Sequence, residues 1–74
     1  MMNLYELYLF AFVRTMSGGD LGIVGQQIQG SGSSTSTNHQ FTALALGAYC
    51  AKNNLLLTKQ QFDAIHPKFL QQSQ

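Results

Sequence analysis

The sequence predicts an all-α protein: a small helical hairpin over about residues 38–52 and 59–66, preceded by an aromatic helix over about residues 3–16. Apolar residues recur at helical spacing on both sides of a Gly/Ser/Thr run at 30–37, which is typical of helices with a buried face. Residues suited to helix capping flank these segments. A chain of 74 residues has a small core, so we expect oligomerisation to complete the fold.

The first predicted helix is the stretch NLYELYLFAFVRTM, residues 3–16. One apolar stripe at helical spacing contains Tyr5, Leu9, Phe12 and Met16, and an adjoining stripe contains Leu4, Leu7, Tyr8 and Ala11. A strand is the alternative, since Tyr, Phe and Val favour strands, but polar and apolar residues do not alternate. A helix that is apolar around most of its circumference lies in a core or at an interface.

The stretch SGGD at 17–20 is typical of one helix ending and another segment beginning. Gly18 or Gly19 can adopt the left-handed C-cap conformation, and the Asp20 side chain can accept a backbone N–H of the next segment. Residues 21–29 follow as a short helix or an extended segment. In the helical alternative one side carries Leu21, Val24 and Ile28.

The Gly/Ser/Thr run is typical of a flexible linker. It divides the chain into an N-terminal aromatic arm (1–29), the linker (30–37), the helical hairpin (38–70) and a tail (71–74). The first hairpin helix is predicted from Asn38 to about Lys52, with Thr37 and Gln40 forming a capping box. Asn53 or Asn54 can end it in the left-handed conformation.

The second hairpin helix has a stronger start signal. Thr58 and Gln61 are spaced as a capping box, and Leu57 and Phe62 occupy the two positions of a hydrophobic staple. This helix is predicted from Lys59 to about His66, because Pro67 disfavours helical geometry in the residue before it. Phe69 and Leu70 would then fold back against the hairpin.

Oligomerisation is expected from the composition. Charged residues make up 9% of the chain, against roughly a quarter in an average soluble domain. Cys50 is the single cysteine, so no intramolecular disulfide can form, and two histidines with one cysteine do not make a closed zinc site. A compact monomer, in which the outer helices cover the middle one, is the alternative. The predicted oligomer interface is Phe41, Leu44, Ala45, Ala48, Tyr49, Leu55, Leu57, Phe62 and Ile65.

The leading functional hypothesis is a small non-enzymatic regulator that oligomerises and binds or sequesters a partner protein, in the style of regulators made by phages and mobile elements. Its arm would either join the core or dock in a groove of the partner, through anchors at helical spacing. The predicted partner-binding residues are Tyr5, Leu9, Phe12 and Met16. We expect no catalytic residues, metal or cofactor. A nucleic-acid partner is not expected, because the chain has no basic patch. A membrane partner is not expected either, because the N-terminal apolar stretch is only about half as long as the roughly 20 residues that span a bilayer.

Other hypotheses remain open. The chain could be a structural or assembly subunit of a larger particle. It could bind DNA as a helix-turn-helix, with Lys59, Gln60 and Gln61 at the start of the second helix. We treat Cys50, flanked by Tyr49 and Ala51, as a buried hydrophobe and not as a nucleophile activated by His39 or His66. Its free thiol suits a reducing compartment, so we expect a cytoplasmic protein.

The N-terminal arm also resembles the double-glycine leader of exported bacterial peptides. Gly18 and Gly19 follow the predicted helix, and Met16, Val13 and Tyr8 stand at the apolar positions that such leaders use. Phe12 stands where those leaders usually carry Glu. The resemblance implies a bacteriocin-like precursor cleaved after Gly19, whereas a helix C-cap followed by a turn is the preferred interpretation of the same residues.

Overall fold

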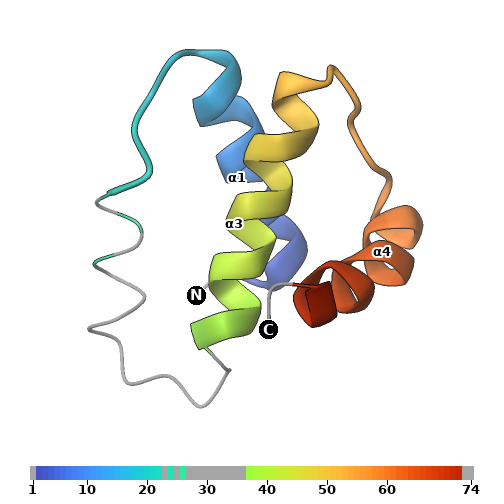
Figure 1. Cartoon of the computed structure of the whole chain (residues 1–74). Coiled ribbons are helices and arrows are strands. Elements are labelled where there is room, and N and C mark those ends of the chain that lie inside the picture. The colour runs from blue at the N-terminus through green and yellow to red at the C-terminus, as the bar shows by residue number, and fades with distance from the viewer. Residues whose placement is uncertain (1, 23, 25, 27–36, 73–74) are drawn as a thin grey trace.

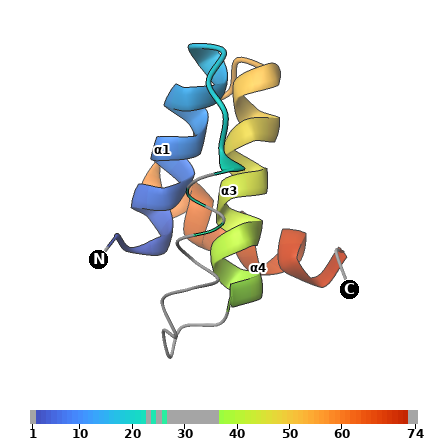
Figure 2. The same ribbon diagram turned by 90° about the vertical axis from the view of Figure 1, so that its left-hand side faces the viewer.

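The computed structural model describes residues 2–22, 24, 26 and 37–72. They form three helices, labelled as in Figure 1: α1 (Leu4–Met16), α3 (Thr37–Lys52) and α4 (Lys59–Gln72). No strand occurs among the described residues, so the all-α prediction is confirmed. Helices α1 and α3 lie side by side and run in the same direction, and α4 lies at an angle to both (Figures 1 and 2).

Both ends of α1 are capped by local hydrogen bonds. Asn3 and Glu6 form a capping box, in which each side chain accepts the other residue's backbone N–H at 2.8 Å. At the other end Gly18 has a left-handed φ of +77°, and the Gly19 N–H donates to the Arg14 carbonyl at 2.7 Å. This is the Schellman arrangement, so the predicted glycine C-cap is confirmed at Gly18.

The segment after α1 follows the sequence prediction as far as it is described. The Asp20 carboxylate accepts the Gly22 N–H at 2.7 Å. Gly22, Val24 and Gln26 are helical, and Leu21 and Val24 pack against the core. Ile28 and the predicted linker lie outside the described residues, except Thr37, which is the first residue of α3. Helix α3 therefore begins one residue earlier than predicted, with Thr37 inside the helix.

A glycine sets how closely α1 and α3 approach each other. Gly47 lies on α3, and a Cβ atom placed there would meet the backbone carbonyl oxygen of Tyr8 and the Ala11 side chain, the latter at 2.8 Å. The same position is 3.1 Å from the backbone nitrogen of Phe12. The backbone of α1 thus lies directly over Gly47, and only glycine leaves room for it.

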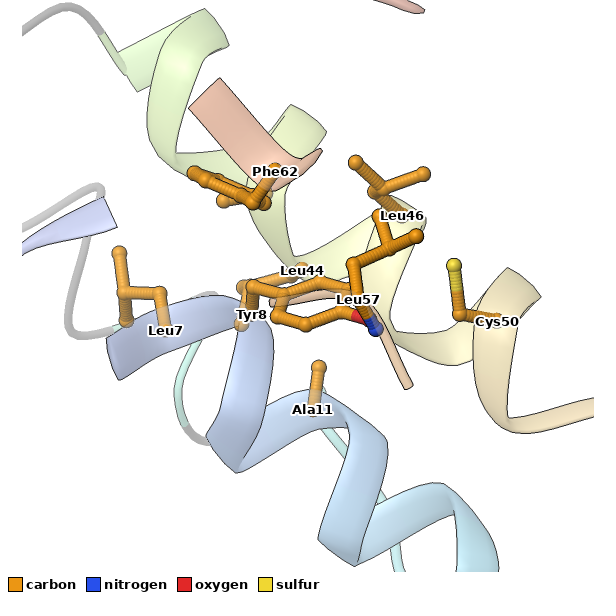
Figure 3. Close-up of a cluster of buried hydrophobic side chains, with 9 residues drawn as sticks. Leu7, Tyr8, Ala11, Leu44, Leu46, Cys50, Leu57 and Phe62 are labelled. Atoms are coloured by element: carbon orange, nitrogen blue, oxygen red, sulfur yellow. The ribbon is translucent and has the colours of Figure 1, made fainter. Parts of the chain in front are cut away.

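The core lies where the three helices meet (Figure 3). Tyr8, Ala11 and Ala43 are completely buried, and the Phe62 ring packs against the Tyr8 ring at a centroid distance of 5.1 Å. The core cluster contains Leu7, Tyr8, Ala11, Ala43, Leu44, Leu46, Cys50, Leu57 and Phe62. Tyr8 therefore lies at the centre of this core, and its buried hydroxyl needs a hydrogen-bond partner there.

That partner is the loop between α3 and α4. Asn54 adopts a left-handed φ of 54°, which confirms the asparagine cap, and the chain then returns toward α1. The Leu57 N–H donates to the Tyr8 hydroxyl at 2.7 Å, and the Tyr5 hydroxyl donates to the Leu57 carbonyl at 2.8 Å. Two tyrosines of α1 thereby satisfy both backbone groups of one loop residue.

The start of α4 is as predicted. The Gln61 N–H donates to the Thr58 hydroxyl at 3.1 Å, and the Thr58 N–H donates to the Gln61 side chain at 2.9 Å. Leu57 and Phe62 are both buried in the core cluster, which is the expected position of a hydrophobic staple.

The predicted end of this helix was wrong. Helix α4 continues through Pro67 to Gln72, although the proline has no N–H for the Asp63 carbonyl. Packing on both sides of the proline outweighs this lost hydrogen bond, because Phe62 and His66 are buried before it and Phe69 packs against the core after it. His66 is thus a buried residue inside the helix and not a helix-end residue.

Candidate functional site

An apolar hollow of about 370 Å³ lies between α3 and α4. We call it the α3–α4 groove. It is lined by Leu46, Tyr49, Cys50, Leu55, Leu57, Ile65, Lys68 and Phe69. Seven of these eight residues are apolar, a composition typical of sites that accept hydrophobic groups.

Helical spacing places the groove residues on facing sides of the two helices. Leu46, Tyr49 and Cys50 are three and four residues apart on α3, and Ile65 and Phe69 are four apart on α4. Residues at these spacings share one face of a helix. The rings of Tyr49 and Phe69 approach across the groove, with centroids 6.3 Å apart.

The groove has a buried floor and an exposed rim. Leu46, Cys50 and Leu57 form the floor and are buried; Figure 3 shows them beside the Tyr8 ring, with the Leu57 nitrogen close to its hydroxyl. At the rim, Tyr49 is 58% and Leu55 is 55% exposed.

The turn after α3 explains why Leu55 reaches this rim. The Leu55 N–H donates to the Cys50 carbonyl at 2.9 Å, and the Asn54 N–H donates to the Ala51 carbonyl at 3.2 Å. In this Schellman arrangement the residue after the left-handed one commonly contacts the last turn of the helix. The same turn that ends α3 therefore places an apolar side chain beside Cys50.

Lys68 is the one charged residue that lines the groove, and none of the lining residues is acidic. Among the described residues, Lys68 makes no ion pair and no hydrogen bond through its ammonium group. The acidic residues are occupied elsewhere: Glu6 and Asp20 accept backbone N–H groups, and Asp63 pairs with Lys59 at 2.9 Å. The groove is therefore lined by apolar side chains and a single lysine.

A second hollow, of about 390 Å³, lies between the start of α1 and α4. It is lined by Asn3, Leu4, Tyr5, Lys59, Phe62, Asp63, His66 and Pro67. The His66 ring stacks on Phe62 at 5.0 Å, and its Nε2 lies 3.1 Å from the His39 carbonyl oxygen. His39 itself is half-buried. These contacts join α3 to α4, so the polar groups here serve the packing of the helices.

The residue considered above as a nucleophile lies in the core. Cys50 is buried beside Tyr8 in the core cluster. Burial raises the pKa of Tyr8 to about 12, and the neighbouring Cys50 adds to this, although the hydrogen bond from Leu57 opposes it. No three His, Cys, Asp or Glu side chains of the described residues converge as metal ligands would.

The predicted oligomer interface divides into three groups. Leu44, Leu57 and Phe62 are buried in the chain's own core; Phe41 and Ala48 are half-buried; Ala45, Tyr49, Leu55 and Ile65 are exposed. The structure brings four of the nine to the groove, namely Tyr49, Leu55, Leu57 and Ile65. The interface itself stays a prediction, now restricted to the side chains that the fold leaves accessible.

The predicted partner-binding residues of the arm are mostly engaged within the chain. Tyr5, Leu9 and Phe12 are half-buried and pack against the core, whereas Met16 is 55% exposed. Two roles were considered for the arm, and its helix α1 packs in the chain's own core.

Sequence reasoning missed four groove residues, Leu46, Cys50, Lys68 and Phe69; for Phe69 a signal can be identified. The signal was present, because Ile65 and Phe69 are four residues apart and would share a helix face. It was hidden by the expectation that Pro67 ends the helix.

None of the described helices combines the length and the hydropathy needed to cross a bilayer. No protein-family model, curated protein or solved structure matches this chain.

Proposed function

We propose that this chain is a small non-enzymatic regulator that binds another polypeptide in the α3–α4 groove. The observation that carries the proposal is the gathering of half-exposed large apolar side chains, Tyr49, Leu55 and Ile65, around one hollow with an apolar floor. Soluble proteins seldom leave contiguous apolar surface of this kind uncovered, and such patches mark sites of protein association.

The groove favours a moderate affinity. Fully burying a large apolar side chain contributes about 1.5–3 kcal/mol, and the rim side chains are already about half buried, so each would contribute about 1 kcal/mol. A micromolar complex requires about 8 kcal/mol in total. The partner must therefore also cover neighbouring surface, such as Leu56, which is 55% exposed in the same loop.

A second copy of the chain is one possible occupant, in keeping with the expected homo-oligomer. Light scattering coupled to size exclusion at micromolar concentration measures this directly. A mass twice that of the 8.1 kDa chain, lost in an Ile65→Lys variant, would identify the occupant as a second copy.

Binding to peptides tests the proposal without knowledge of the partner. The folded chain would be used to select from a displayed random-peptide library, and the affinity of the selected peptides would be measured by fluorescence anisotropy. We expect Ile65→Lys to weaken binding at least tenfold, because it places a charge at the apolar rim.

The matched control is Val13→Lys. Val13 is 61% exposed on α1 and does not line the groove, so this variant should bind within twofold of the wild type. Circular dichroism would establish that both variants are folded. Selection of no peptide, or of peptides that bind both variants equally well, would refute a binding function for the groove.

A further inference from the structure

We propose that the segment bound in the α3–α4 groove is an amphipathic helix that carries a carboxylate beside its apolar anchors. The inference rests on the proposed function and adds the conformation and the charge of the partner. It comes from two independent features of the groove: the absence of a strand edge among its described residues and its single unpaired cation.

The first feature concerns backbone hydrogen bonds. Helices α3 and α4 supply the walls of the groove and use their backbone groups internally. In the loop, the Leu57 N–H and carbonyl are held by Tyr8 and Tyr5, and the Leu55 N–H is held by the Cys50 carbonyl. The described residues contain no strand whose edge an extended peptide could join.

An extended segment in this groove would find no strand edge to pair with and would leave most of its own N–H and carbonyl groups without partners, which is costly. A helix satisfies these groups internally and presents only side chains to the groove. This is the helix-in-groove mode of recognition, with anchors at i, i+3 or i+4.

The second feature is Lys68. Lys68 lines the apolar groove with no acidic neighbour in the lining, and its ammonium group is unpaired among the described residues. A carboxylate on the polar flank of the bound helix would complement it, and charge complementarity of this kind sets orientation and specificity more than affinity.

A second copy of this chain supplies such a carboxylate poorly. The Glu6 carboxylate caps α1, the Asp20 carboxylate holds the Gly22 N–H, and Asp63 is paired with Lys59. Each already uses one carboxylate oxygen within its own chain, so Lys68 of another molecule would have to share the group with that existing partner. We therefore assign the groove to a different polypeptide.

The test is selection from a displayed library of amphipathic 14-residue helices with a fixed apolar face and one randomised flanking position. On the wild-type chain we expect Asp or Glu to be enriched at that position. Exchanging the selected acid for Gln should weaken binding about two- to fivefold, the usual effect of an exposed ion pair. On Lys68→Glu the enrichment should reverse to Lys or Arg.

The matched control is Lys52→Glu. Lys52 is exposed in the last turn of α3 and does not line the groove, so acidic enrichment should persist in this variant. The same library would be selected on Ile65→Lys to identify peptides that depend on the groove.

The outcomes separate the two proposals. Groove-dependent peptides without acidic preference, or with the same preference on Lys68→Glu, would overturn the charge assignment while the binding function stands. Groove-dependent peptides that lose affinity when their helix is stapled would overturn the helical conformation. A dimer that dissociates in Ile65→Lys would assign the groove to a second copy. The absence of any groove-dependent peptide would overturn both proposals.

Discussion

The contact between α1 and α3 predicts an unusual response to a glycine-to-alanine substitution. At an exposed helical position, Gly→Ala stabilises a helix by about 1 kcal/mol. At Gly47, however, the new methyl group would overlap the Tyr8 carbonyl oxygen and approach the Ala11 Cβ atom to 2.8 Å. The obstructing oxygen belongs to the backbone of α1, which cannot rotate away as a flexible side chain can.

Overpacking of a core costs about 1–3 kcal/mol and occasionally more. Because a backbone atom is involved, we place Gly47→Ala near 3 kcal/mol, or about 2 kcal/mol net after the gain in helix propensity. A chain of 74 residues has a total stability of only about 4–11 kcal/mol. In a domain of this size, a loss of 2 kcal/mol lowers Tm by about 8–16 °C.

Thermal unfolding followed by circular dichroism at 222 nm, at one fixed protein concentration, would measure this change. Ala45→Gly is the control, because Ala45 is exposed on the same helix and should lose only about 1 kcal/mol from helix propensity. A Gly47→Ala variant with a Tm equal to or above that of the wild type would show that α1 does not lie over Gly47 and would refute the packing described here.

Two further predictions concern the tyrosines that hold Leu57. In urea unfolding, Tyr8→Phe should cost about 1–3 kcal/mol because it leaves the buried Leu57 N–H unpaired. Tyr5→Phe should cost less, because Tyr5 is half-buried and its hydrogen bond to the Leu57 carbonyl is only partly buried; equal losses would contradict this difference. Between pH 10 and 12 the free energy of unfolding should fall by about 2–3 kcal/mol. Unfolded tyrosine loses its proton near pH 10, whereas the pKa of Tyr8 is raised to about 12 in the folded chain. The unfolded state therefore binds fewer protons in that range, and raising the pH favours it. This part of the pH dependence should be absent from Tyr8→Phe, and an identical pH profile for both proteins would argue against a buried hydroxyl.

Most local signals in the sequence were reliable, although Pro67 did not end α4 and Thr37 lies inside α3 rather than before it. The capping box of Thr58 and Gln61, the left-handed caps at Gly18 and Asn54, and the apolar helix at 3–16 all appear in the structure. Each depends on hydrogen bonds or backbone angles within a few residues, so the sequence determines it directly.

The candidate site was only partly predictable. Tyr49, Leu55 and Ile65 were expected at an interface and remain exposed at the groove. Leu44 and Phe62 had the same apolar character in the sequence, yet they lie in the chain's own core. Apolar character alone does not determine which side chains are buried within the chain and which stay exposed to a partner.

The sequence by itself determined that this chain is helical and where most of its helices begin and end, because capping and helical periodicity are local properties. Tertiary structure decided the rest. Packing of Phe62, His66 and Phe69 allows α4 to continue through Pro67. Helix α1 packs directly over Gly47 and holds Leu57 by hydrogen bonds with two tyrosine hydroxyls. These contacts join residues up to 52 positions apart, and only they bring α3, the loop and α4 together as a groove.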